Sequence, residues 1–176
     1  MINRFITVAI CGLMAWLTAC NGNETTLPPE YEGPLSEAES VVMQYAEKDR
    51  VKVKLTASKI LEYKNGDQEF PGGIFIEFYD EVGSLTSTLR ANDAYFFKSE
   101  NKWRGRGNVE VINTQKDEQL RTEELFWKPD TKKIFTDQFV TIKLQSEVVY
   151  GTGLEADEDM SHYQIKNPEG EFVVEE

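Results

Sequence analysis

The residues that most often build catalytic and metal sites are scarce in this sequence. Its 176 residues include one histidine, His162, and two cysteines, Cys11 and Cys20. A single imidazole without a neighbouring thiol makes a poor metal site. The phosphate-binding pattern Gly-x-x-x-x-Gly-Lys-Ser/Thr does not occur. We therefore expect a protein that binds or scaffolds, with no catalytic residue, no metal and no cofactor.

Basic residues are also in short supply. The sequence has 31 acidic and 19 basic side chains, which give a formal net charge of −12. Because neutralising phosphates needs clustered Lys and Arg, this balance excludes nucleic acid as a partner and argues against a polybasic grip on anionic lipid headgroups. Hydrophobic residues make up 40% and charged residues 28%. These fractions and this length are typical of one globular domain.

Only the beginning of the chain carries a long apolar run, FITVAICGLMAWLTA, from Phe5 to Ala19. As a helix the run would span about 22 Å, which is short of a hydrocarbon core of about 30 Å and suits a signal peptide better. It ends in Leu17-Thr18-Ala19-Cys20, which matches the bacterial lipobox. We expect a signal peptide over residues 1–19 and a lipid attached to Cys20. The alternative is an ordinary secretory signal with an incidental cysteine.

Residues 20–40, with their prolines, glycines and acids, are expected to form a flexible linker, and residues 41–176 a β-domain. Alternating apolar residues predict half-buried strands at 51–55, 74–78, 109–111 and 139–144. Turns are expected at 64–67, 128–131 and 166–170. Residues 35–46 are left open between a short helix and a strand.

An internal repeat gives the architecture. Four segments share leucine, any residue and a small residue: Leu55-Thr56-Ala57, Leu89-Arg90-Ala91, Leu120-Arg121-Thr122 and Leu154-Glu155-Ala156. A unit of two or three strands cannot bury its apolar face alone, so the units must stack. Chance alignment of short β-motifs is the alternative. The expected fold is all-β, with stacked antiparallel strands in two sheets.

Several stretches are similar to the LptC family of lipopolysaccharide-export proteins. They are LTASKILEY (55–63), FYDEVGSLTSTLRANDAYF (78–96), RGNVEVIN (106–113), LRTEELFWKPDTKKIFTDQFVTI (120–142) and GTGLEADEDMSHYQIKNPEG (151–170). Together they cover nearly the whole expected domain, and the resemblance is especially close to family members that begin with a lipobox. Better-known members keep an uncleaved membrane helix where this chain has the lipobox.

The resemblance implies an open, V-shaped β-jellyroll with an apolar slot between its two sheets. The slot would take the acyl chains of lipid A. The implied partners are lipopolysaccharide, the subunits of an inner-membrane ABC exporter, a periplasmic bridge protein of the LptA type, and a membrane through the lipid anchor. The implied location is the periplasm, with the anchor in the inner membrane. Any ATP hydrolysis must take place in a partner.

The repeat and its partner strands supply the candidate residues. The predicted acyl-chain slot comprises Leu55, Ala57, Ile74, Ile76, Phe78, Leu89, Ala91, Val109, Val111, Leu120, Val140, Ile142, Leu154 and Ala156. Each position is equally well explained as plain jellyroll core. The expected partner edges contain Val41, Val51, Val53, Tyr163, Phe172 and Val174. Arg90, Arg121 and Glu155 are expected to face water.

A second function fits the same sequence. An envelope lipoprotein could use a β-sandwich to bind a glycan or a protein partner and carry no lipid. Glycan binding would need exposed aromatic rings, for which Trp103 and Trp127 are the candidates, since they lie near expected turns or strand ends.

Overall fold

The computed structural model describes residues 30–170 and leaves residues 1–29 and 171–176 undescribed. The chain divides into two units, residues 1–31 and 32–176, and all the strands lie in the second. The strands are β1 (Ser36–Glu47), β2 (Arg50–Glu62), β3 (Gln68–Phe70), β4 (Ile74–Tyr79), β5 (Leu85–Ala91), β6 (Asp93–Phe97), β7 (Lys102–Asn113), β8 (Glu118–Lys128), β9 (Lys133–Lys143), β10 (Val148–Asp157) and β11 (Tyr163–Glu169), with a 3-10 turn, η1 (Lys98–Glu100), before β7. Over residues 30–170, no helix has the length and apolar character needed to cross a membrane.

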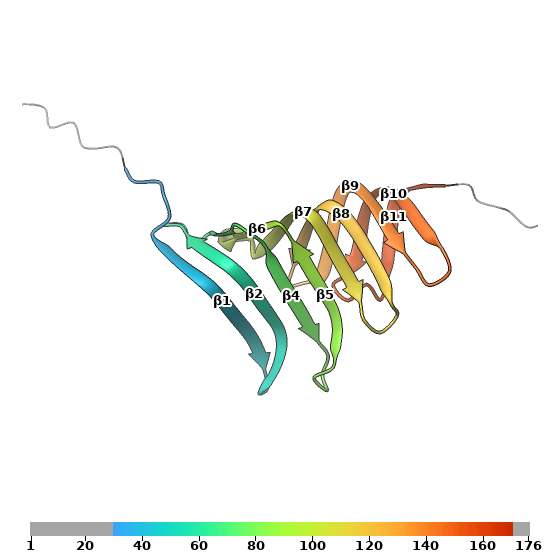
Figure 1. Cartoon of the computed structure of the whole chain (residues 1–176), viewed down its shortest axis with the longest axis horizontal. Helices are drawn as coiled ribbons and strands as arrows, with labels where there is room; N and C mark the ends of the chain where they lie inside the picture. The colour runs from blue at the N-terminus through green and yellow to red at the C-terminus, as the bar shows by residue number, and fades with distance from the viewer. Residues whose placement is uncertain (1–29, 171–176) are drawn as a thin grey trace, which may run out of the picture. The chain divides into compact units, whose positions relative to one another are not determined.

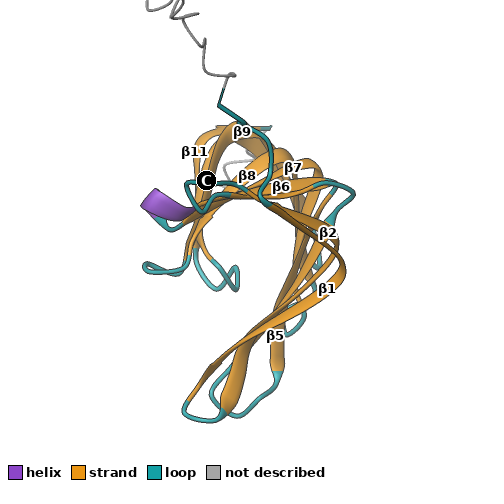
Figure 2. Ribbon diagram, turned by 90° about the vertical axis from the view of Figure 1, so that its left-hand side faces the viewer, coloured by secondary structure: helices purple, strands orange, loops and turns teal. Residues whose placement is uncertain are grey.

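The strands pair antiparallel into one continuous sheet (Figure 1). Its main path runs β11-β10-β9-β8-β7-β5-β4-β2, and β1 pairs with the far side of β2. The expected all-β, jellyroll-like class is confirmed. Within the β-rich unit, one curved, hydrogen-bonded sheet takes the place of two separate sheets, and Figure 2 shows this curvature.

The sheet forks between β2 and β7. The first half of β2 pairs with β4 and its last two residues with β3, while the two halves of β7 pair with β6 and β5. A bulge at Gly107 and Asn108 separates the halves of β7, and both residues have a positive φ, +72° and +47°. Glycine adopts this conformation without steric cost, and a bulge bends its strand. Ser58 Oγ donates to the carbonyl of Gly72 at 2.8 Å across the fork.

Strand register arranges the side chains in rows that cross the sheet. On the inner face, one row is apolar from β1 to β10: Met43, Leu55, Ile76, Leu89, Val111, Leu120, Ile142 and Val149. The next row, on the outer face, is mostly polar: Val42, Thr56, Phe75, Arg90, Glu110, Arg121, Thr141 and Tyr150. Alternation along each strand therefore separates a buried face from a wet one.

The turn between β10 and β11, residues 158–162 and hereafter the closing turn, fills one end of the inner face. Asn113 Nδ2 donates to the carbonyl of Asp159 at 2.7 Å, and Ser87 Oγ donates to that of Glu158 at 3.1 Å. Met160 of this turn is completely buried. The closing turn thus ties the end of the chain to β5 and β7.

Most of the expected local structure is confirmed. The four predicted strands lie within β2, β4, β7 and β9 apart from Leu144, which follows β9. The segment 35–46 forms a strand from Ser36 onward rather than a helix. The turn expected at 166–170 is wrong, because Asn167 and Pro168 continue β11 and pair with β10. Pro168 is tolerated because an edge strand needs no donor on its open side.

The first strand begins before the expected domain boundary, and the leucine repeat is only partly in register. β1 begins at Ser36, inside the expected linker, where an edge strand with exposed acidic side chains shows no apolar alternation. The first three Leu-x-small segments share rows, but Leu154 pairs with Thr136, outside the row of Leu120. The row of Leu120 continues instead through Ile142 to Val149 on β10.

Candidate functional site

The residues of the predicted slot all lie on the inner face and are buried in one hydrophobic cluster. Leu55 and Phe78 also line an open groove, and Ala57, Ile74, Ala91 and Val109 border a second one on the outer side. The remaining members of the set are packed in the core. Whether any of them meets lipid stays a prediction. Arg90, Arg121 and Glu155 face water, as expected.

The inner face opens into a groove of about 1000 Å³ on the side of β1 and β2. Its apolar lining comprises Met43, Tyr45, Val53, Leu55, Phe78, Trp103 and Trp127. Phe78 meets Trp127 edge to face at 5.2 Å between ring centroids, and the two tryptophan rings are 6.1 Å apart. Tyr45 is 62% exposed, so β1 leaves part of the apolar face uncovered. We call this space the inner groove.

Charged side chains surround the inner groove. The rim carries Glu47, Lys52, Asp80, Glu81, Asp130, Lys132, Asp157, Glu158 and Asp159. Lys52 is already engaged, since its Nζ lies 2.8 Å from a carboxylate oxygen of Glu81. The acids outnumber the bases, so the groove offers an apolar surface with an acidic border. Such a site favours a long apolar group over an anion.

Asp157, at the end of β10, and Glu158, in the closing turn, place two carboxyl groups with oppositely shifted pKa values at this rim. Burial raises the pKa of the Glu158 carboxyl, although Trp127 Nε1 donates to it at 2.8 Å. Hydrogen bonds from Lys133 and His162 lower the pKa of Asp157 to about 2. The Nζ of Lys133 lies 2.7 Å from Asp157 Oδ1. The hydrogen bond from Trp127 Nε1 to Glu158 ties the indole ring, which lines the groove, to the closing turn.

The residues proposed for partner edges fall in three places. Val41 lies on β1 and Tyr163 on β11, the two outermost strands of the sheet. Val51 and Val53 lie on β2, which β1 covers, so an added strand would meet β1 first. Phe172 and Val174 lie outside the described residues, as do the expected signal peptide and Cys20.

The prediction missed part of the inner groove. Met43 and Tyr45 lie in the segment for which both a helix and a strand were considered. Their alternation with Val42 and Gln44 favours a strand and could have identified them. The position of the closing turn could not be predicted in this way, because its contacts are with β5 and β7, which are distant in the sequence. The tryptophans proposed as exposed glycan contacts are instead packed: Trp127 is buried, and Trp103 stacks against Phe70 and Phe96.

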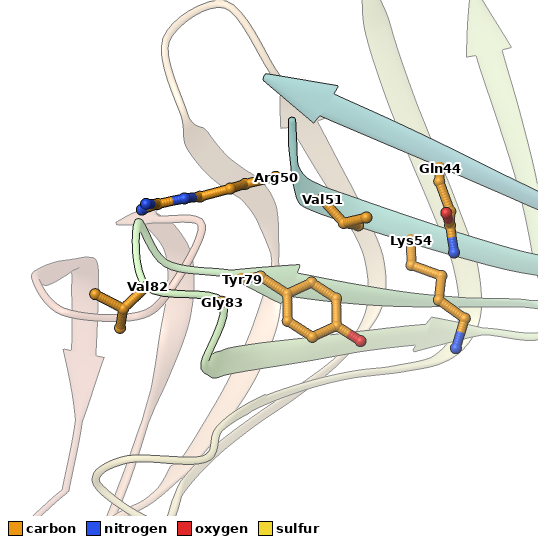
Figure 3. A pocket seen from close by; sticks show the side chains of 7 residues that line it. All are labelled: Gln44, Arg50, Val51, Lys54, Tyr79, Val82 and Gly83. Carbon is orange, nitrogen blue, oxygen red and sulfur yellow. The ribbon is translucent and has the colours of Figure 1, made fainter. Parts of the chain in front are cut away.

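A smaller hollow of about 540 Å³ lies between the β1–β2 hairpin and the β4–β5 turn (Figure 3). Lys54 and Tyr79 both contact its wall, and both are bonded to Glu77, at 2.7 Å and 3.0 Å. The hydrogen bond from Lys54 lowers the pKa of Glu77. The carboxylate of Glu77 already binds both Lys54 and Tyr79, so these two polar groups are less available to a ligand. The inner groove is therefore the better candidate site.

A curled antiparallel sheet with an open, partly apolar groove on its inner face defines an all-β protein with a jellyroll-like fold. The sequence matches the model of the family described as lipopolysaccharide-assembly, LptC-related, over residues 5–168. The chain therefore belongs to the LptC-related family. Its role is in lipopolysaccharide transport, as a periplasmic component of the export machinery, and the family is not known for enzymatic activity. No curated protein matches the sequence.

Proposed function

We propose that this protein accepts lipopolysaccharide from the subunits of the inner-membrane ABC exporter and passes it to a periplasmic bridge protein of the LptA type. The inner groove shields the acyl chains during the transfer. The supporting observation is an open space of about 1000 Å³ lined by Tyr45, Phe78, Trp103 and Trp127, directly continuous with the core. The predicted slot residues beneath it would extend the path if the sheet opens.

The energetics favour a grip on the acyl chains. Exposing one chain of 12 to 14 carbons to water costs about 10 kcal/mol, at about 0.8 kcal/mol per methylene. The protein carries a formal charge of −12 and the groove has an acidic rim, so the phosphates of lipopolysaccharide find little attraction there. Raising the ionic strength is therefore expected to strengthen binding or leave it nearly unchanged.

Strands β1 and β11 are the proposed docking edges, because the outermost strands present unpaired backbone groups. β1 extends from Ser36 to Glu47 and contains no proline, whereas the shorter β11 contains Pro168. We assign one edge to the exporter and the other to the bridge protein. The exporter supplies the energy for transport.

The first test concerns the groove. A photo-crosslinking amino acid at Tyr45 is expected to capture lipopolysaccharide in cells, because this side chain reaches the groove and already has aromatic bulk. Val42 is the matched control. It lies on the same strand, is 57% exposed and points to the outer face. Gel mobility and immunodetection of lipopolysaccharide measure the adduct.

Adducts at Tyr45 and not at Val42 support transport through the inner groove. Equal labelling at both positions, or none at Tyr45 in a folded and abundant protein, would contradict it. A second crosslinker at Val53 repeats the comparison on β2.

The second test concerns the anchor. Replacing Cys20 with alanine removes the only sulfur available for lipid attachment at the lipobox. We expect the unprocessed precursor to accumulate without attached lipid, as measured by mass spectrometry of the intact protein. Normal acylation of Cys20→Ala would overturn the proposed lipoprotein anchor.

A further inference from the structure

A second groove, of about 1150 Å³, lies on the outer face of the sheet, over the fork. Its lining includes Phe75, Arg90, Glu110, Arg121, Phe139 and Thr141. Four of these belong to the single outer row that runs from β4 to β8, and Thr141 continues it on β9. The outer groove is separate from the inner groove, because the two share no lining residue.

Its centre is a fixed arrangement of two guanidinium groups on one carboxylate. Arg90 Nε lies 2.7 Å from Glu110 Oε1, and Arg121 Nη2 lies 3.2 Å from Oε2. The carboxylate of Glu110 is only 8% exposed, whereas the two arginine side chains are about 60% exposed. Gln119 also donates to Glu110. The buried acid thus holds two planar donor groups in place and leaves their outer faces to solvent.

Aromatic rings flank this centre. Phe75 is 41% exposed on one side and Phe139 is 49% exposed on the other. Phe139 stacks on Tyr150 at 6.4 Å, which keeps its ring oriented. The two rings do not form a continuous apolar patch, so what they offer a ligand is two separate flat surfaces on either side of the Arg–Glu centre.

Small polar groups complete the lining between the rings. Thr56, Ser58 and Thr141 supply hydroxyls, and Asn92, Asn108 and Gln138 supply amides. A sugar ring has an apolar face of C–H groups and a rim of hydroxyls, so it needs a flat ring beneath and short donors and acceptors around it. A long acyl chain would leave these polar groups without partners. With Glu110 and Glu123 offsetting Arg90 and Arg121, the groove has no net charge to attract a polyanion.

We propose that the outer groove binds an oligosaccharide, with sugar rings on Phe75 and Phe139 and their hydroxyls on Arg90 and Arg121. Two sources offer this chemistry: the sugar chain of lipopolysaccharide, which would rest on the proposed transport function, and a cell-wall glycan, which would not. In the first case the two faces of one sheet hold the two halves of the same lipid.

Saturation-transfer NMR on the full-length protein in detergent micelles tests the proposal. One probe is the lipid-free oligosaccharide released from lipopolysaccharide, and the other is a soluble glycan fragment of peptidoglycan. We expect transfer to at least one probe. Phe139→Ala and Arg121→Gln should each weaken its affinity tenfold or more, since both side chains are exposed and their loss leaves the core intact.

Arg106→Gln is the matched control. Arg106 is also exposed on the outer face of β7 and faces its own carboxylate, Glu124, at 3.4 Å, but does not line the groove. Affinity unchanged in Arg106→Gln and reduced in the other two variants supports the site. No transfer to either probe, or the same affinity in all three variants, would overturn it. Crosslinking at Tyr45 is unaffected by this outcome, so the two proposals fail separately.

Discussion

The two faces of this sheet are built from the same strands and differ in almost every other respect. At neighbouring positions of β8, Leu120 is completely buried and Arg121 is exposed. The inner row is aliphatic from β1 to β10, whereas the outer row centres on ionic contacts to Glu110. A period of two residues therefore lets a single layer present an apolar groove and a polar groove back to back.

The comparison also shows where the stability resides. The free energy gained by burying apolar side chains scales with the area removed from water, and the buried apolar cluster lies on the inner face of this sheet. The ion pairs of Arg90 and Arg121 with Glu110 contribute less, because both arginine side chains are mostly in solvent. The inner face should therefore set the fold and the outer face should be open to substitution.

The sharpest test is the pair Leu120→Ala and Arg121→Ala. Removing the buried leucine is expected to lower the free energy of unfolding by about 3 kcal/mol, because it leaves a cavity in the core. The adjacent arginine should cost under about 1 kcal/mol. Urea unfolding followed by tryptophan fluorescence measures both. Similar losses in the two variants would contradict the division between the faces.

A smaller effect is expected at the closing turn. Asn113 donates to the carbonyl of Asp159 and accepts from the backbone N–H groups of Gln115 and Lys116. Asn113→Ala removes all three hydrogen bonds of this buried side chain and should lower the free energy of unfolding by about 2 kcal/mol. Thr141→Ala, half-buried on the outer face, is the control. Equal midpoints of urea unfolding for the two would show that the turn is held by other contacts.

The smallest effect is a change of stability with pH at the rim of the inner groove. The pKa of Asp157, lowered to about 2 from 3.8, means that this carboxylate stabilises the fold above about pH 4, and that the contribution is lost as the pH falls toward 2. The difference in stability between the wild type and Asp157→Asn should shrink over that range. A difference that stays constant with pH would refute the assignment.

The carboxyl group of Glu158 changes stability with pH in the opposite direction to Asp157. Its raised pKa means that the folded protein binds the proton more tightly than the unfolded chain, so stability declines as the pH rises above the ordinary value of 4.5. Glu158→Gln keeps an acceptor for Trp127 and should remove this decline. The outer-face variant Arg121→Gln should leave the pH profile of the wild type unchanged.

The fold class could be predicted because apolar and polar residues alternate strongly, as in Ile74–Phe78, and because the Leu-x-small segment recurs along the chain. The sequence also identified the inner face correctly. It could not locate the open part of that face, because the groove is lined jointly by β1, β2, β4 and the closing turn, which only the folded sheet brings together. That arrangement depends on register and on contacts between residues as distant as Ser87 and Glu158.

The outer groove was beyond prediction for a similar reason. Phe75 and Phe139 are 64 positions apart in the chain and line one groove only because five strands lie in register. The sequence marked Arg90 and Arg121 as facing water, which is correct, but it gave no sign that Glu110 joins them. An acid next to Val109 and Val111 looked like one more solvent-facing residue.

The complete burial of Met160 protects its sulfur from oxidation. Oxidants convert a thioether to a polar sulfoxide only where they can reach it, and this sulfur has no exposed surface while the closing turn is seated. Once oxidised, the side chain would no longer fit an apolar interior, so a released turn could not return. In an oxidising envelope, the modification state of this one methionine records chemically how often the end of the sheet has come open.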